Sequence, residues 1–306
     1  MTLNHTLKRS LAALLAPVIA LMILAASQPA RSNDTNGPAI WKLEDADSEI
    51  WLFGTVHILK PSLAWENDQI SAAFNAADTL ITEAAVHDIE PAAMQGLVMK
   101  HGINQTGPSF LGKLSPEGRK NFETLLTSLG MPAAAVNNFA PYRPWLAAVT
   151  LQTLKIQSMG GDPEAGVDKL LWKQAQAAGK KLEYLETAEE QIQIFGKLSP
   201  EEELYFFEEG LKQMIEEPDL LDKIVADWKA GNIEDLTAKM QASMVGQDTL
   251  YDVLLTKRNS NWADQIKTLM DGEGKVFIAV GAAHLAGEDS VQDILKEKYG
   301  LTAKRQ

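Results

Sequence analysis

Two histidines, His57 and His284, stand in the same short pattern near opposite ends of the chain. Each lies three residues after a glycine, in Gly54-Thr-Val-His57 and in Gly281-Ala-Ala-His284, and each pattern follows an almost wholly apolar run. Histidine is the commonest metal ligand in proteins and titrates near neutral pH. A single histidine after an apolar strand is most often structural, with one ring nitrogen bonded to a backbone carbonyl. Two copies so far apart in the chain predict two histidines brought to one place.

Two carboxylates occupy comparable positions. Glu83 ends the strand candidate 78–83, and Glu186 ends the strand candidate 181–186. Each carboxylate taken alone would most simply be a solvated strand end. In an α/β sheet with parallel strands, however, ligands lie outside the carboxyl ends of the strands. We therefore expect both histidines and one or both of these carboxylates to form one cluster, which suits a divalent cation with an open coordination position.

Composition limits the chemistry that this cluster can have. The chain has 306 residues and no cysteine, so disulfides and thiol catalysis are excluded, and a metal site has to rest on His, Asp and Glu. Nitrogen and oxygen ligands without sulfur favour Mn, Co or Zn. The net charge is −13 and no basic cluster offsets it, which argues against nucleic acid as a partner. Nothing in the sequence predicts an oligomeric state.

The N-terminus has the pattern of a secretory signal peptide over residues 1–27. Lys8 and Arg9 precede the mostly apolar run 11–26, and small residues follow at the expected cleavage position. The run is short for a transmembrane helix, so a retained anchor is the less favoured alternative. We expect cleavage, no stable membrane span in the mature chain and a periplasmic location, with residues 28–39 as a polar lead-in.

The remaining sequence alternates strand and helix patterns, which predicts an α/β fold with a small mixed, mainly parallel sheet. The first two strand candidates, 40–44 and 49–54, are separated by a turn pattern and should form a hairpin. We expect one catalytic domain over residues 40–303. Within it, the helical stretches 91–157 and 199–271 should be insertions that form walls or a lid over the site.

Three local patterns near the site predict helices. A helical stretch of about fifteen residues follows Pro61 and ends near Ala77. Asp162-Pro163 has the pattern of an N-cap followed by proline, and predicts a helix that continues to Ala178. A capping-box pattern begins at Thr187, directly after Glu186.

The other polar residues of interest are weaker candidates. His87 lies four residues beyond Glu83, close enough to reach the rim of the site. Arg258 and Asn259 lie in a long polar helical stretch and would most simply be solvated. The sequence has no His-Glu-x-x-His motif, no Gly-x-Ser-x-Gly motif and no phosphate-binding glycine loop.

The sequence resembles the TraB/PrgY/GumN family, on its GumN-like bacterial side. That family is related to the Tiki metalloproteases and more distantly to erythromycin esterase and the ChaN-like proteins. The resemblance covers roughly residues 40 to 303 and rests on Trp41, the two Gly-x-x-His motifs, Glu83, Gly166-Val-Asp168, Leu185-Glu-Thr187 with Gln191, and Arg258-Asn259. Ala286 departs from the pattern, which has proline between His-Leu and Gly.

The resemblance implies an EreA/ChaN-like fold and a metal-dependent hydrolase, with a peptide or small molecule as substrate. Tiki relatives cleave peptide bonds with a divalent metal. By this resemblance the two histidines and Glu83 are expected to hold the ion. Glu186 is expected to act as an outer-sphere carboxylate or general base, and Arg258 and Asn259 to stabilise an oxyanion.

Two other functions use the same residues. ChaN-like relatives bind haem, so the alternative is a periplasmic protein that binds haem or a metal ion without catalysis. A third interpretation is an interaction or scaffold protein that uses the long helical part, residues 199–271. A Soret band would favour haem, and metal-stimulated peptide cleavage would favour hydrolysis.

Overall fold

The computed structural model describes residues 37–243 and 248–306 of the chain. In this part, six strands form one sheet in the order β4-β3-β5-β2-β1-β6. Their bounds are Ile40–Glu44 (β1), Ser48–Thr55 (β2), Thr79–Ala84 (β3), Lys181–Glu186 (β4), Gly274–Gly281 (β5) and Lys304–Arg305 (β6). The four strands β4, β3, β5 and β2 run parallel, and β1 pairs antiparallel with β2 and with the short β6. The predicted α/β class, mainly parallel sheet and first hairpin are confirmed.

The helices precede, connect and follow these strands. Their bounds are Asp68–Ala76 (α2), Pro91–Gly102 (α3), Pro116–Ser128 (α4), Pro144–Ser158 (α5), Val167–Ala177 (α6), Ala188–Gln193 (α7), Pro200–Glu216 (α8), Leu220–Ala230 (α9), Ile233–Ser243 (α10), Asp248–Tyr251 (α11), Lys257–Met270 (α12) and Val291–Tyr299 (α13). A π-helical turn (η5, Asp252–Thr256) leads into α12, and short 3-10 turns occupy Pro163–Ala165 (η3) and Ala282–Leu285 (η6).

Helices cover both faces of the sheet. Successive side chains of a strand point to opposite faces, so each buried strand contributes to a core on either side. On β5, Phe277 and Ala279 pack in a cluster with residues of α2, α6 and α9. Ile278 and Val280 pack on the other side with residues of α12 and α13. The buried β5 therefore reads as a continuous apolar run, as parallel strands do.

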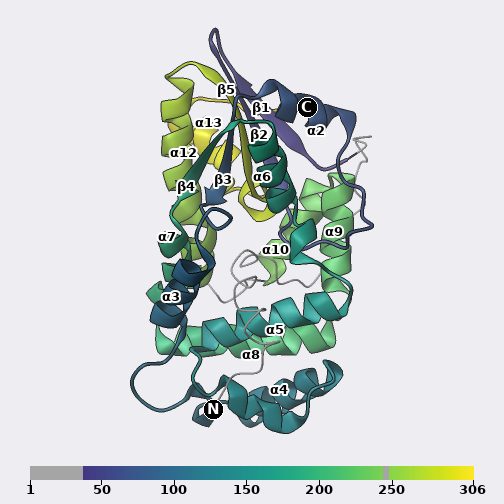
Figure 1. Cartoon of the computed structure of the whole chain (residues 1–306), viewed down its shortest axis with the longest axis vertical. Coiled ribbons are helices and arrows are strands. Elements are labelled where there is room, and N and C mark those ends of the chain that lie inside the picture. The colour runs from purple at the N-terminus through teal and green to yellow at the C-terminus, as the bar shows by residue number, and fades with distance from the viewer. Residues whose placement is uncertain (1–36, 244–247) are drawn as a thin grey trace.

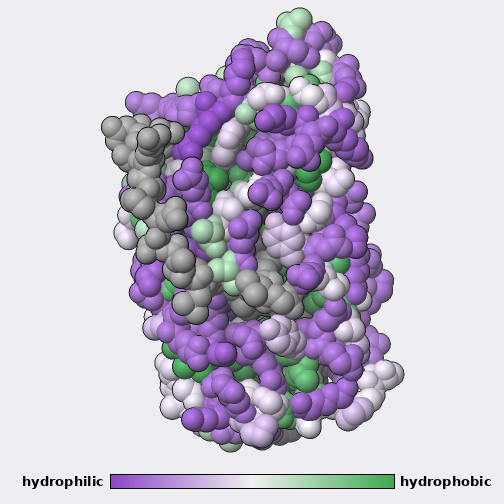
Figure 2. Space-filling model, turned by 180° about the vertical axis from the view of Figure 1, so that it is seen from behind, coloured by the Kyte–Doolittle hydropathy of each residue, from purple (hydrophilic) through white to green (hydrophobic). Residues whose placement is uncertain are grey.

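A second layer of helices lies beyond the carboxyl ends of the parallel strands. In Figure 1, α5 and α8 run side by side beneath the sheet, with α4 below them. This layer has its own core, in which Trp145 of α5 stacks on Phe195 with ring centroids 4.9 Å apart. The carboxyl ends of the strands therefore point toward this helical layer (Figure 1). Seen from behind, the surface outside the grey atoms is largely hydrophilic, with small apolar areas between polar side chains (Figure 2).

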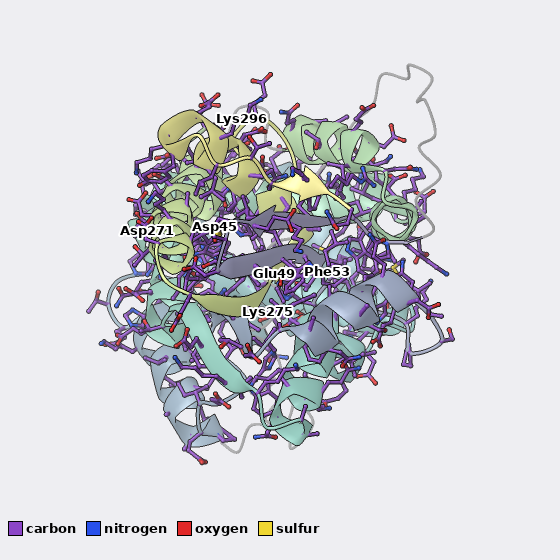
Figure 3. The ribbon with its side chains drawn as sticks, turned by 90° about the horizontal axis from the view of Figure 1, so that it is seen from above. Asp45, Glu49, Phe53, Asp271, Lys275 and Lys296 are labelled. Atoms are coloured by element: carbon purple, nitrogen blue, oxygen red, sulfur yellow. The ribbon has the colours of Figure 1, made fainter. Side chains whose placement is uncertain are left out.

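At the opposite end of the sheet, the amino ends of the parallel strands are exposed to solvent. Figure 3 looks onto this end, where Glu49 of β2 and Lys275 of β5 lie together, with the Lys275 Nζ 2.8 Å from the Glu49 Oε1. An exposed ion pair of this kind contributes little to stability. The buried polar groups described below belong to the other end.

Two helix predictions near the site need correction. The stretch after Pro61 forms a helix only from Asp68, where Asn67 caps the first turn, so α2 is shorter than expected. The helix expected from Pro163 is interrupted: η3 ends at Ala165, and α6 begins at Val167. The cause is contact with another segment, because a Cβ on Gly166 would lie only 2.2 Å from the His57 carbonyl oxygen.

The predicted signal peptide, residues 1–27, lies outside the described residues. Across 37–243 and 248–306, the helices are all too short or too polar to cross a membrane.

Candidate functional site

The two Gly-x-x-His motifs contact each other directly. β2 and β5 are neighbouring parallel strands, and Thr55 pairs with Gly281 at their carboxyl ends. Gly54 packs against the other motif so closely that a Cβ on it would lie 3.0 Å from the Cα of Ala282. A side chain at position 54 would therefore press on the backbone of the second motif, which favours glycine here. The Gly54 carbonyl accepts a hydrogen bond of 2.8 Å from the indole of Trp228, which fixes this strand end.

His57 is oriented by a carboxylate that sequence reasoning did not assign to the site. Its Nδ1 lies 3.0 Å from Oδ1 of Asp168, in the first turn of α6. Because an ionised carboxylate can only accept, Nδ1 carries the proton. His87 also contacts Asp168, with Nε2 2.9 Å from Oδ2, so Asp168 joins two histidines. The His57 Nε2 points toward Gly281, 3.5 Å from where a Cβ on that glycine would lie.

His284 is completely buried, at 0% exposure, and its tautomer follows from its neighbours. Its Nε2 lies 3.0 Å from Nη1 of Arg258. A guanidinium can only donate, so Nε2 accepts and Nδ1 carries the proton. That proton goes to Oδ1 of Asn259, 2.5 Å away, while the Asn259 amide donates to the Asp289 carbonyl. Each histidine is thus held through its outer nitrogen and presents Nε2 inward.

Glu83 lies between the two histidines. It is 6% exposed, and its Oε1 accepts from the Gly281 amide at 2.5 Å and lies 3.8 Å from the His284 Nε2. Its Oε2 accepts from Arg258 at 2.8 Å and from Gln191 of α7 at 3.0 Å. A Cβ on Gly281 would lie 2.9 Å from Oε1, so any side chain there would displace this carboxylate.

Arg258 links the other groups of the cluster by hydrogen bonds. A guanidinium has five N–H donors, and all five are engaged, at 2.8–3.2 Å, by two oxygens of Glu186, one of Glu83, the Leu254 carbonyl and His284. Glu186 also accepts from the Trp262 indole at 3.1 Å. Arg258 lies two residues after the end of the π-helical turn, a feature that is frequent at functional sites.

Burial and charge act in opposite directions on the ionisable groups of this cluster. Burial disfavours ionisation of Glu83, but Arg258 and the neighbouring histidines outweigh it and hold its pKa at about 2. Burial also opposes a charged His57, yet the Asp168 carboxylate raises its pKa to about 9. Burial and the charge of Arg258 lower the pKa of His284 well below 6.5, in keeping with its neutral tautomer. Burial raises the pKa of Glu186 despite its pairing with Arg258.

The donor set fits a divalent ion in its chemistry but is not arranged as a closed metal site. Two imidazole Nε2 atoms and a carboxylate converge, each imidazole with an outer hydrogen-bond partner of the kind that metal-ligating histidines have. Within the described residues, however, no group of three or more His, Asp or Glu side chains is close enough to hold an ion. Two of the candidate ligand atoms are already engaged by hydrogen bonds: Arg258 donates to the His284 Nε2, and the Gly281 amide donates to the Glu83 Oε1.

The structure brings all six predicted site residues into one cluster: His57, Glu83, Glu186, Arg258, Asn259 and His284. Their roles stay predictions. Within the described residues all five N–H groups of Arg258 are engaged, so none of them is free for the expected oxyanion role. The Asn259 amide donates one of its two hydrogens to the Asp289 carbonyl.

Sequence reasoning missed Asp168 and Gln191 as members of the site. An acidic residue in the first turn of an amphipathic helix is usually explained by the helix dipole, so the pattern of α6 alone carries no signal. The family resemblance did carry one, because both Asp168 and Gln191 are among the residues on which it rests. The spacing of His87 from Glu83 did indicate a place near the rim, and its contact with Asp168 agrees.

Fold and site together define an α/β protein with a buried strand-end cluster of two histidines, three carboxylates and one arginine. The chain belongs to the TraB/PrgY/gumN family, whose model matches residues 39–304. The matched segment contains every residue of the cluster.

The chain is also similar to the "Uncharacterized protein YbaP" of Escherichia coli (strain K12), with 25% identity over 266 residues, which is 87% of this chain and 95% of that protein. The protein of the same name from Shigella flexneri matches equally. An "Uncharacterized protein" of Treponema pallidum (strain Nichols) is 22% identical over 279 residues, covering 84% of this chain and 80% of that protein. No solved structure matches the chain.

Proposed function

We propose that this protein is a metal-dependent hydrolase that binds one divalent ion through His57, Glu83 and His284. The observation that carries the proposal is the orientation of the two imidazoles. Asp168 and Asn259 hold their outer nitrogens. The His284 Nε2 lies 3.8 Å from the Glu83 Oε1, and the His57 Nε2 points toward Gly281, whose amide donates to the same oxygen. This outer hydrogen bonding fixes the tautomer that a metal ligand needs.

The charge balance supports a cation at this place. The cluster has three carboxylates and one permanent cation. Arg258 pairs with Glu83 and Glu186, whereas Asp168 contacts His57 and His87. Without a further positive charge the cluster carries excess negative charge in a region of low dielectric, which is unfavourable. A proton on His57 would supply part of the missing positive charge, and a divalent cation of the Mn, Co or Zn type would supply all of it.

The residues of the chain have separate tasks in this proposal. The chemistry that a divalent ion supplies here is polarisation of a substrate carbonyl group and acidification of a water molecule. Arg258 must withdraw from the His284 Nε2 to free that nitrogen, and its bonds to both Glu83 and Glu186 keep it nearby. Glu186, whose pKa burial raises, is the carboxylate suited to take and return a proton.

The substrate class follows by resemblance, since relatives of the Tiki type cleave peptide bonds. Haem ligation is less well supported by the geometry. A porphyrin is a wide, flat group that requires an open face, whereas His284 is fully buried against Arg258, Asn259 and Trp262, whose ring lies 4.2 Å away.

Metal-stimulated cleavage of a peptide library tests the proposal. We expect cleavage by purified protein that is lost on chelation and restored by Mn, Co or Zn. Glu183→Gln, on the same strand as Glu186 but outside the cluster, is the control and should behave as the wild type. Cleavage that survives chelation would contradict the proposal, and a Soret band in the purified protein would favour the haem-binding alternative.

A second prediction separates the two glutamates. Glu83 has both oxygens directed into the cluster, so Glu83→Gln should strip the ion. Glu186 contacts Arg258 and Trp262 instead, so Glu186→Gln should leave the ion largely bound and slow turnover, by about 10–100-fold as for other outer-sphere partners. Metal titration and single-turnover rates on both variants decide the matter. If Glu186→Gln loses the ion and Glu83→Gln keeps it, the two roles are reversed.

A further inference from the structure

Asp168 contacts two histidines, and the proposed metal centre includes one of them, His57. The other is His87, whose Nε2 lies 2.9 Å from the Asp168 Oδ2. Burial raises the pKa of Asp168, but His57 and His87 outweigh burial and lower it below its ordinary value, so this carboxylate is ionised and only accepts. The His87 Nε2 therefore carries a proton and donates it to Asp168.

The position of His87 connects a strand of the site to the helix that carries Asp168. His87 lies in the loop between β3 and α3, four residues beyond Glu83. Its side chain is 7% exposed, and its ring packs on Trp172 with the centroids 5.8 Å apart. Trp172 follows Asp168 by four residues on α6, so both side chains lie on one face of that helix. His87 is thus held against α6 by its ring and by its hydrogen bond.

The two histidines of the proposed metal centre have the same kind of support. His284 donates to Asn259, and the Asn259 amide is itself anchored on the Asp289 carbonyl, 2.6 Å away. His57 donates to Asp168, which is in turn held by the loop histidine. An outer partner can orient a metal-ligating imidazole only if its own position is fixed. For His284 the last group is backbone, whereas for His57 it is a side chain that can be replaced without changing the ligand or its partner.

Another histidine–carboxylate contact shows why burial matters. The His101 Nε2 lies 2.9 Å from the Glu189 Oε1, but the Glu189 side chain is 39% exposed. The Asp168 side chain is 9% exposed, and its two oxygens each contact a histidine. A carboxylate in solvent replaces a lost partner with water, whereas a buried one is left unsatisfied or turns away from its remaining donor. Loss of His87 should therefore be transmitted to His57.

We infer that His87 is a positioning residue of this site, which through Asp168 fixes the orientation in which the His57 Nε2 binds a divalent ion. The part of the inference that concerns the ion rests on the proposed function, and the part that concerns the orientation of His57 does not. His87 touches neither the ion nor the substrate. What position 87 requires is a hydrogen-bond donor with the reach of Nε2.

Three substitutions at position 87 separate the hydrogen bond from the packing. His87→Phe keeps a ring against Trp172 and removes the donor. His87→Gln places an amide nitrogen at about the reach of Nε2, whereas the amide of His87→Asn stops one bond short. NMR of the metal-free full chain with isotope-labelled histidine reads the Nδ1 proton of His57, whose signal is assigned by its absence in His57→Ala. We expect this signal to shift and to exchange faster with water in the Phe and Asn variants, and to stay near its wild-type position in the Gln variant.

Titration of the same variants with Zn measures the consequence for the ion. We expect its Kd to rise about 3–10-fold in His87→Phe and His87→Asn, less than the 10–100-fold typical of a directly bonded outer partner, and to stay within about twofold of wild type in His87→Gln. His101→Phe is the matched control. It removes a histidine from a carboxylate outside the cluster, so it should change neither the His57 signal nor the Kd.

Two results would overturn the inference: a wild-type His57 signal and Kd in His87→Phe, or a His87→Gln variant that behaves like His87→Phe. A purely structural role would lower stability in all three variants without restoring the signal in the one with the correct reach. Thermal unfolding identifies any variant that does not fold, and if His87→Phe fails, the comparison of Gln with Asn decides. A wild-type chain that binds no divalent ion would contradict the proposed function, and the His57 signal alone would then decide whether His87 orients the imidazole.

Discussion

Replacement of either His57 or His284 by alanine is expected to reduce bound metal to background. The two imidazoles follow the carboxyl ends of neighbouring strands, one on each side of Gly281, and loss of either leaves too few ligands for a protein-held ion. Elemental analysis of protein dialysed against Mn, Co or Zn measures the occupancy. Hydrolysis should be lost in parallel, because the proposed chemistry needs the ion.

A variant that weakens metal binding without abolishing it serves as the control for this prediction. Asp168→Asn keeps the size of the side chain that holds the His57 Nδ1, and removes its charge, so metal affinity should fall about 10–100-fold and not vanish. Thermal unfolding of each variant shows whether the fold survives. If His57→Ala or His284→Ala retains full occupancy, the two histidines do not share an ion.

Arg258→Met is expected to destabilise the fold by about 3–5 kcal/mol at pH 7, because it leaves two carboxylates buried without their cation. Arg258 is 4% exposed and pairs with Glu83 and Glu186, both at 2.8 Å. The loss should be measured by urea unfolding, with Lys267→Met on the exposed face of the same helix as control.

The loss should depend on pH in a defined direction. In the wild type the pKa of Glu83 is about 2, below its ordinary value of 4.5, so its contribution to stability is present above about pH 4.5 and disappears as the pH falls toward 2. Arg258 is the largest of the groups that lower this pKa, so its removal should raise the pKa of Glu83. The gap in unfolding free energy between wild type and variant should therefore be largest near neutral pH and shrink below pH 4.5. A gap that is constant with pH would mean that Arg258 stabilises by packing alone.

The parallel strands could be predicted because each one is a short run of consecutive residues followed by a polar side chain, and such a pattern is visible without knowledge of the rest of the chain. This is why Glu83, Glu186 and both histidines were correctly placed at one sheet edge. The interruption at Gly166 was not predictable in this way. Its cause is the approach of the His57 carbonyl, which lies more than a hundred residues earlier in the chain.

The burial of Arg258 could not be predicted from the local sequence pattern either. A polar helical stretch normally indicates solvent exposure, and nothing in the pattern of α12 distinguishes Arg258 from the solvated Lys257 beside it. Only the assembled fold places two carboxylates and an imidazole around that one position. Likewise, Asp168 is identified by what it contacts and not by its place in α6.

The order of strands has a consequence for how the chain folds during synthesis. The central strand β5 separates β3 from β2, yet it leaves the ribosome after every helix from α2 to α12. The sheet therefore cannot close until almost the whole chain is available, and its closure depends on contacts of high contact order, which form slowly. β5 also carries Gly281 and leads to His284, so the polar cluster is assembled in the same late step. Until then Glu83 and His57 lie on strands that are not yet joined.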